Sequence, residues 1–297
     1  MHPAEPLTPR HLFCFGCGYT AQRLARRLLA EGTRVSGTAR SPEGVQRLQG
    51  LGIEGHRFDG DAPVPATALD GVTDILCSIP PGEGGEDGVI SAHGAALANL
   101  PTLRWCALLS TTGVYGDVDG AWIDESAPLR PSSERARRRV ACEDRWLAWA
   151  RAHGKAVQVF RLPGIYGPHR SPFARLRAGT ARRIIKARHV FNRIHVDDIA
   201  SALQLAMDHP EAGPIFHLAD EEPAPSDEVL TYAASLLGLP PPPATSIEAD
   251  DVSPTAREFY AECKRLKTAR AKQALGFSPQ FPSFREGLAA VLAEETQ

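Results

Sequence analysis

The feature that most constrains this chain is a regular alternation of short apolar segments with longer amphipathic ones over its first two thirds. Short apolar runs predict buried strands, and apolar residues at helical spacing predict helices. When the two alternate, each helix carries the chain back across the sheet and the strands pair in parallel. Strands are expected at residues 11–15, 34–38, 53–58, 74–79, 105–110 and 157–162, and helices at 19–30, 42–49, 88–100 and 133–153. The sequence therefore predicts an α/β fold with a doubly wound parallel sheet, the Rossmann fold.

A glycine-rich hexapeptide follows the first expected strand and opens the first expected helix. It reads Gly16-Cys17-Gly18-Tyr19-Thr20-Ala21 and fits the pattern GxGxxA. In such a loop Gly16 allows a tight turn, Gly18 lets a pyrophosphate approach the backbone, and Ala21 lets helix and strand pack closely. The N–H groups at the helix start, those of Tyr19 and Thr20 included, and the helix dipole attract the anion. This context predicts a dinucleotide site, with a glycine turn that binds no ligand as the alternative.

The end of the second expected strand indicates which dinucleotide is preferred. A site for NAD places Asp or Glu there to accept hydrogen bonds from the ribose. This stretch has no acid but contains Thr38, Arg40 and Ser41, whose hydroxyl and guanidinium groups suit a 2′-phosphate. We therefore expect NADP as the cofactor, with NAD as the alternative and a solvated loop charge as the other interpretation of Arg40. Asp59, just after the third strand, either meets the adenine edge or caps a turn.

The pattern loosens after residue 162, and the last part of the chain is expected to form a smaller lobe. This part has a basic stretch at 175–193, a helix after His195, a proline-rich connector at 239–244 and a final amphipathic helix from about Ser283. The basic stretch suits either a phosphate of the substrate or plain surface. We expect residues 1–162 to be the dinucleotide-binding domain and residues 163–297 to be mostly a small C-terminal substrate lobe. The helix–strand unit at 195–218 is expected to pack back on the Rossmann core.

Composition argues against several classes of partner. The formal net charge is -2, so no basic field is expected to attract nucleic acid. No apolar run approaches the roughly 18–20 residues that span a bilayer, and residues 1–10 have the composition of a loose leader rather than a signal peptide. We expect a cytoplasmic protein without a membrane or nucleic-acid partner, either a monomer or a homodimer. Six scattered cysteines are expected to be reduced thiols, and no metal site is predicted, because Cys14 and Cys17 have no second pair.

Several segments in this order resemble the extended (epimerase/dehydratase-type) short-chain dehydrogenases/reductases. Besides the hexapeptide they are 110–116 (STTGVYG), 161–168 (RLPGIYGP), 194–200 (IHVDDIA), 216–219 (FHLA) and 275–279 (LGFSP). The resemblance spans nearly the whole chain. It implies a nicotinamide cofactor and an oxidoreductase or epimerase activity on a small polar, anionic, sugar-nucleotide-like substrate.

The chain departs from this resemblance where the family keeps its catalytic tyrosine. The family's motif PxxPxSxYxxSK, followed by Glu, aligns without a gap with residues 128–143, which read PLRPSSERARRRVACE. Arg135 then stands at the tyrosine position and Arg139 at the lysine position. A guanidinium stays protonated near pH 7, so Arg135 cannot exchange the proton that the tyrosine moves. Thr111 matches the Ser/Thr that hydrogen-bonds the reacting oxygen in the family.

The candidate catalytic residues are therefore Thr111, Tyr115, Arg135 and Arg139, and each has an alternative interpretation. We expect Arg139 to contact the cofactor and Arg135 to bind an anionic group of the substrate, both pointing into the cofactor cleft. The alternative is a solvated helix face, because runs of charge usually are solvated. Tyr115 is either a substitute acid/base or a packing residue. The resulting expectation is an NAD(P)-dependent oxidoreductase or epimerase without the usual tyrosine, and the alternative is a non-catalytic NADP(H)-binding sensor or regulatory protein.

Overall fold

The computed structural model describes residues 9–60 and 62–296, so residues 1–8 of the expected leader lie outside the described residues. The described chain divides into two compact units by its internal contacts. The first unit comprises Arg137–Phe160, Ala200–Phe216 and the described residues up to Ser110. The second unit comprises Thr111–Ala136, Arg161–Ile199 and the described residues from His217 onward.

The first unit is built on a seven-stranded sheet with the order β11-β7-β5-β4-β1-β2-β3. β1 pairs in parallel with β2 and β4, β2 with β3, and β4 with β5. The strand order reverses between β1 and β4, and ligands of such sheets bind at the carboxyl ends of the strands beside this switch point. The strands are β1 (His11–Phe15), β2 (Arg34–Ala39), β3 (Glu54–Arg57), β4 (Asp74–Cys77), β5 (Trp105–Thr111), β7 (Val157–Leu162) and β11 (Ile215–His217).

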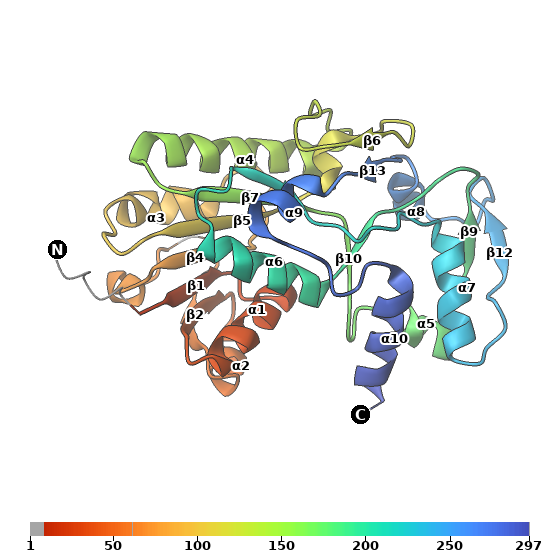
Figure 1. The fold of residues 1–297 in the computed structure, drawn as a ribbon, viewed down its shortest axis with the longest axis horizontal. Helices are drawn as coiled ribbons and strands as arrows, with labels where there is room; N and C mark the ends of the chain where they lie inside the picture. The colour runs from red at the N-terminus through yellow and green to blue at the C-terminus, as the bar shows by residue number, and fades with distance from the viewer. Residues whose placement is uncertain (1–8, 61, 297) are drawn as a thin grey trace. The chain divides into compact units, whose positions relative to one another are not determined.

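Helices cover both faces of this sheet, as Figure 1 shows, with α3 and α4 on one face and α1, α2 and α6 on the other. On the second face, Arg27 of α1 donates to Ser201 Oγ of α6 at 2.6 Å, and Gln204 of α6 donates to Glu31 at 2.9 Å. The helices are α1 (Tyr19–Ala30), α2 (Pro42–Gly50), α3 (Gly88–Ala98), α4 (Glu134–His153) and α6 (Val196–Asp208), with a 3₁₀ turn at Ala66–Leu69. The predicted fold class is confirmed, and each predicted strand and helix of this part lies within two residues of its expected ends.

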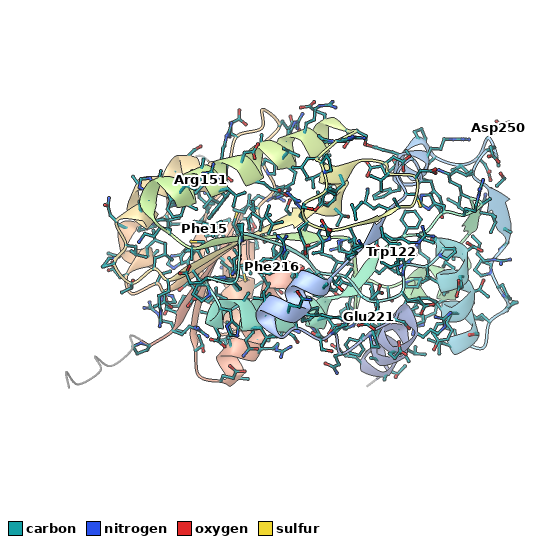
Figure 2. The ribbon with its side chains drawn as sticks, turned by 45° about the horizontal axis from the view of Figure 1, so that its top comes forward. Phe15, Trp122, Arg151, Phe216, Glu221 and Asp250 are labelled. Carbon is teal, nitrogen blue, oxygen red and sulfur yellow. The ribbon has the colours of Figure 1, made fainter. Side chains whose placement is uncertain are left out.

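The core of the first unit lies between the sheet and these helices. Phe15 is fully buried and packs against Phe58 and His93, with ring centroids 5.8 and 4.8 Å away. Figure 2 marks Phe15 in this interior and Arg151 on α4, where the side chain is exposed. Alternate strand residues bury their side chains on both faces, which is why these strands read as continuous apolar runs.

The second unit contains short strands and helices around a smaller core. Three two-stranded parallel ladders join β10 to β8, β12 to β9 and β13 to β6. The strands are β6 (Trp122–Ile123), β8 (Gly164–Tyr166), β9 (Arg183–Ile185), β10 (Arg193–His195), β12 (Ala244–Ser246) and β13 (Arg265–Leu266). The helices are α5 (Phe173–Arg177), α7 (Ser226–Leu236), α8 (Pro254–Phe259), α9 (Ala269–Leu275) and α10 (Phe284–Glu295), with a 3₁₀ turn at Thr112–Tyr115. Ser283 caps α10 in a capping box with Glu286, which explains the expected helix start there.

The contact-based units differ in part from the division expected from the sequence. Residues 111–136 belong to the second unit by their contacts, whereas the expected boundary at 162 placed them with the dinucleotide-binding part. Residues 200–216 belong to the first unit. The functional boundary at residue 162 stays a prediction. Among the described residues, no helix combines the length and the apolar character that crossing a membrane requires.

Candidate functional site

The glycine loop between β1 and α1 has two glycines with opposite surroundings. Gly16 has φ +78°, and a Cβ there would lie 2.7 Å from Ile79 Cγ1 and 3.1 Å from Ser78 Oγ. Its N–H donates to Thr38 Oγ1 at 2.8 Å, and its carbonyl accepts from the Ser78 hydroxyl. At Gly18, a Cβ would meet nothing within 4 Å. Gly16 is therefore fixed by the turn, while Gly18 presents open backbone.

The start of α1 is the part of this loop that suits an anion. Gly18 is the N-cap residue and has no side-chain capping bond, and the first turn of α1 carries no acid. Ala21 is fully buried against the sheet and Thr20 is 7% exposed, as the expected close packing requires. An uncapped helix start beside an open glycine provides the cradle and the dipole that a pyrophosphate needs. The residues present thus fit the expected dinucleotide.

The end of β2 differs in detail from the expected 2′-phosphate site. Thr38 is 2% exposed, and its hydroxyl accepts from the Gly16 N–H, so it holds the glycine loop. Ser41 caps α2 by accepting from the Gly44 N–H at 3.2 Å. Arg40 is exposed at the strand end, as a phosphate-binding side chain would be. The binding roles of all three residues stay predictions.

A second arginine near the end of β2 was not singled out from the sequence. Arg47 of α2 places its Nη2 atom 3.6 Å from the position of a Cβ on Gly44, close to the Ser41 cap. Its position could have been inferred from the sequence, because Arg47 lies about one turn and a half beyond Ser41 on a helix that starts beside the end of the strand. Asp59 pairs with Arg57 Nη2 at 2.9 Å. This ion pair is compatible with both interpretations of Asp59, the adenine contact and the turn cap, and does not distinguish between them.

Helix α4 turns one face toward the carboxyl end of β5. Arg139 donates from Nη1 to the Leu109 carbonyl at 3.1 Å, and one turn later Glu143 accepts from the Ser110 hydroxyl. Arg139 is half-buried and Glu143 is 1% exposed. Arg135, four residues before Arg139, is exposed and forms no hydrogen bond or ion pair with the described part of the chain. The predicted roles of both arginines in binding stay predictions.

Thr111 and Tyr115 belong to the second unit and have different surroundings. Thr111 is half-buried, and its Oγ1 accepts from the Gly113 N–H at 3.2 Å. Tyr115 is fully buried, and its hydroxyl accepts from Arg161 Nη1 at 2.6 Å and lies 2.5 Å from His217 Nε2. The Nδ1 atom of His217 lies 3.1 Å from the Lys267 carbonyl. Because Nδ1 then carries the proton, Nε2 is left to accept from the Tyr115 hydroxyl.

This Tyr115 network was not predicted, although its members stand in motifs that were noticed. Arg161 opens the segment RLPGIYGP, and His217 stands in FHLA. Burial lowers the pKa of His217, so the imidazole stays neutral near pH 7. With its hydroxyl engaged on both sides, Tyr115 has the surroundings of a packing residue. Its role as an acid/base stays a prediction.

The cysteines form no disulfide. All six are free, and five of them are buried. A hydrogen bond with Cys17, followed by burial, raises the pKa of Cys14, and burial raises the pKa values of Cys77 and Cys106. Protonated, buried thiols are poor nucleophiles and poor metal ligands. Among residues 9–60 and 62–296, no group of three or more His, Cys, Asp or Glu is placed to hold a metal ion.

Comparisons with known proteins agree with this geometry. The family described as "NAD dependent epimerase/dehydratase family" matches residues 103–219, which include the segments at 110–116, 161–168 and 194–200. Protein YeeZ of Escherichia coli strain K12 is 29% identical over 239 residues, covering 76% of this chain and 84% of YeeZ.

Two solved structures extend the likeness to nearly the whole chain. A functionally unknown conserved protein from Silicibacter pomeroyi is 44% identical, with a TM-score of 0.89 over 97% of this chain and 100% of that one. The dTDP-glucose 4,6-dehydratase from Bacillus anthracis, solved in complex with NAD, is 16% identical, with a TM-score of 0.78 over 96% of each chain, and shows the fold alone. Together with the matched segments, these findings lead to one conclusion. The chain is similar to the NAD-dependent epimerase/dehydratase family of extended short-chain dehydrogenases/reductases, as its sequence motifs predicted, and the family's model matches residues 103–219.

Proposed function

We propose that this protein is an NADP(H)-dependent oxidoreductase or epimerase that acts on a small, polar, anionic substrate such as a sugar nucleotide, without the family's usual tyrosine. The observation that carries the proposal is the glycine loop, where an open Gly18 adjoins the uncapped start of α1. The dTDP-glucose and NAD named for the Bacillus anthracis dehydratase support the substrate class and the cofactor class.

The first unit provides the residues that would hold the cofactor. The backbone from Gly16 to Ala21 would bind the pyrophosphate, because its N–H groups and the helix dipole favour an anion. Arg40 and Arg47, both exposed beside the end of β2, would bind the 2′-phosphate of NADP, and Asp59 would meet the adenine edge. Arg139 would bind the nicotinamide ribose from α4. The bound nicotinamide supplies the hydride donor or acceptor.

The second unit provides the residues proposed to act on the substrate. Arg135 is exposed and permanently charged, so it would bind an anionic group such as a phosphate. Thr111 Oγ1 would donate a hydrogen bond to the reacting oxygen and move its proton through water. Tyr115 is the less suitable proton donor, because its buried hydroxyl already bonds to Arg161 and His217.

The same Tyr115 network favours a second candidate function, a protein that binds NADP(H) as a sensor or regulatory ligand. In this case no side chain would exchange a proton with a substrate, and Arg135 would bind an anionic partner. The two functions share the cofactor site and differ in whether hydride moves to a substrate and in what Arg135 binds. A cytoplasmic location also stays a prediction.

One experiment tests both. NADPH and NADH are titrated into the protein by fluorescence, and a panel of sugar nucleotides, beginning with dTDP-glucose, is then incubated with the protein and NADP or NAD. The enzyme function predicts saturable NADPH binding and a sugar product, detected by mass spectrometry, that depends on the protein. Binding without any product over the panel favours the sensor, and a failure to bind either dinucleotide contradicts both functions.

A further inference from the structure

The second unit contains a cavity of about 340 Å³ that the proposed function does not use. It lies among α5, α7 and α10, and this volume is at the small end of the usual range for ligand pockets. Its apolar wall includes Val229, Phe284 and Leu288, and its polar wall includes Arg170, Arg175 and Arg193. A cavity with one apolar wall and several arginines suits an amphipathic anion.

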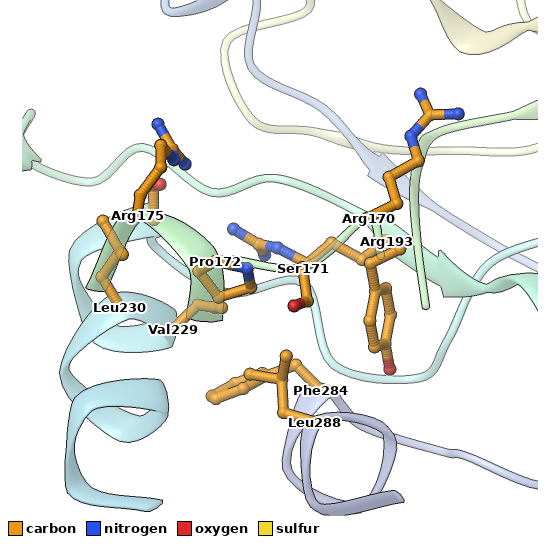
Figure 3. A pocket seen from close by; sticks show the side chains of 11 residues that line it. Arg170, Ser171, Pro172, Arg175, Arg193, Val229, Leu230, Phe284 and Leu288 are labelled. Atoms are coloured by element: carbon orange, nitrogen blue, oxygen red, sulfur yellow. The ribbon is translucent and has the colours of Figure 1, made fainter. Parts of the chain in front are cut away.

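Arg193 is the central charged group of this cavity. Figure 3 shows its guanidinium between Pro172 and Ser171, above the apolar wall, while Arg170 and Arg175 extend outward on either side. Arg193 donates from Nη1 to the Phe191 and Ala224 carbonyls at 3.0 and 2.9 Å. Within the described ranges, no carboxylate forms an ion pair with it. Arg193 is half-buried, and this burial lowers the pKa of its guanidinium.

The acid that acts most strongly on Arg193 does not neutralise it. Asp220 is 4% exposed, and neither of its oxygens forms a hydrogen bond of normal geometry with the described residues, although the amides of Arg193 and Glu222 favour its ionised form. Burial raises the pKa of Asp220 to about 8, and the Arg193 guanidinium offsets only part of this effect. Asp220 is therefore mostly protonated at neutral pH. Glu222 is held by Arg285 at 2.5 Å.

A half-buried cation without an anionic partner loses part of its hydration, and an anion that enters the cavity would offset part of this cost. Arg175 is exposed at the entrance and adds a second positive charge. We propose that this cavity is a binding site for a compact organic anion, a phosphate or carboxylate attached to a small apolar group. The charged end would contact Arg193 and Arg175, and the apolar group would pack on Phe284 and Leu288. All the residues that line the site belong to the second unit, and none of them belongs to the dinucleotide loop.

The test uses phenyl phosphate as the probe, titrated into the full chain by calorimetry at pH 7. Inorganic phosphate and phenol are titrated in parallel, because each carries only one of the two features that the cavity recognises. We expect saturable binding of phenyl phosphate that is tighter than that of either comparison compound. Saturating NADPH should leave this affinity unchanged, since the two proposed sites share no residue.

Variants then locate the site. Arg193→Gln should weaken phenyl phosphate binding by about tenfold or more, the usual effect of losing a charge-assisted hydrogen bond, and Arg175→Gln should weaken it less. Arg182→Gln is the matched control, because Arg182 is an exposed arginine that pairs with Asp251 and does not line the cavity. If Arg193→Gln does not fold, Arg175→Gln and a crystal soaked with phenyl phosphate decide the question.

Three results would overturn the proposal. The first is the absence of saturable binding, and the second is binding that Arg175→Gln and Arg182→Gln affect equally. The third is competition between phenyl phosphate and NADPH, which would place the probe in the glycine loop instead. If the full chain binds phenyl phosphate but does not bind NADPH, the proposed function is contradicted while the proposed ligand site in this cavity is supported.

Discussion

The two glycines of the β1–α1 loop allow the dinucleotide site to be separated experimentally from the fold. Replacing each by alanine adds the same methyl group at positions two residues apart. At Gly16 the methyl group would enter a filled space, 2.7 Å from Ile79 Cγ1, on a backbone with φ +78°. At Gly18 it would enter open space, on a backbone with φ -90°. Gly16→Ala should therefore damage the fold, and Gly18→Ala should damage only binding.

The expected changes in the free energy of unfolding and in NADPH affinity follow from these surroundings. An L-residue in the left-handed region costs about 1–2 kcal/mol, and forcing a methyl group into a packed site costs about 1–3 kcal/mol. Gly16→Ala should thus lower the free energy of unfolding by about 2–5 kcal/mol. Gly18→Ala should change it by less than about 1 kcal/mol, because no atom has to move and the unfolded chain loses some freedom. If a pyrophosphate lies against Gly18, the methyl group should weaken NADPH binding by about tenfold or more, which is about 1.4 kcal/mol.

The assay combines urea unfolding, followed by circular dichroism, with fluorescence titration of NADPH. The larger variant Gly18→Val should abolish cofactor binding while the protein stays folded. If Gly18→Ala and Gly18→Val bind NADPH as tightly as the unaltered protein, the pyrophosphate is not at this loop. If Gly16→Ala is as stable as the unaltered protein, the interpretation of the turn as sterically filled is wrong.

Three further predictions address the cofactor and the buried charges. NADPH should bind more tightly than NADH, and Arg40→Ala should narrow this difference in fluorescence titrations; equal affinities in the unaltered protein would contradict the preference. Arg139→Ala should weaken NADPH binding by about 1–3 kcal/mol, whereas Arg135→Ala should leave it nearly unchanged. Asp220 is protonated in the folded protein up to pH about 8 but only up to about pH 4 when unfolded. Its favourable contribution to the free energy of unfolding is therefore complete below about pH 4. This contribution is lost as the pH rises through 8, by at most about 1.4 kcal/mol per pH unit. Asp220→Asn should remove this pH dependence of the free energy of unfolding, and the variant should be more stable than the unaltered protein at pH 9. If urea unfolding shows that the free energies of unfolding of the two proteins change equally with pH across this range, the raised pKa of Asp220 is refuted.

The sequence by itself determined the features that depend on neighbouring residues. The strands of the first unit and the helices between them follow from the spacing of apolar residues, which reflects the geometry of strand and helix. The glycine loop was recognisable because its function depends on three small residues at fixed spacing, Gly16, Gly18 and Ala21. These features could be predicted since each is decided within a few residues of chain.

Only the tertiary structure decided which polar groups are engaged and which are exposed. Thr38 was expected to bind a phosphate, and only the structure shows that its hydroxyl also accepts from the N–H of Gly16, 22 residues earlier in the chain. The Tyr115 hydroxyl lies 2.5 Å from Nε2 of His217, 102 residues later, and no local pattern predicted this contact. The strand β11 has only three residues, too few to show a period, and it is defined by its place beside β7 in the sheet. In each case the deciding partner is distant in sequence, and hydrogen bonding and burial depend on distance in space.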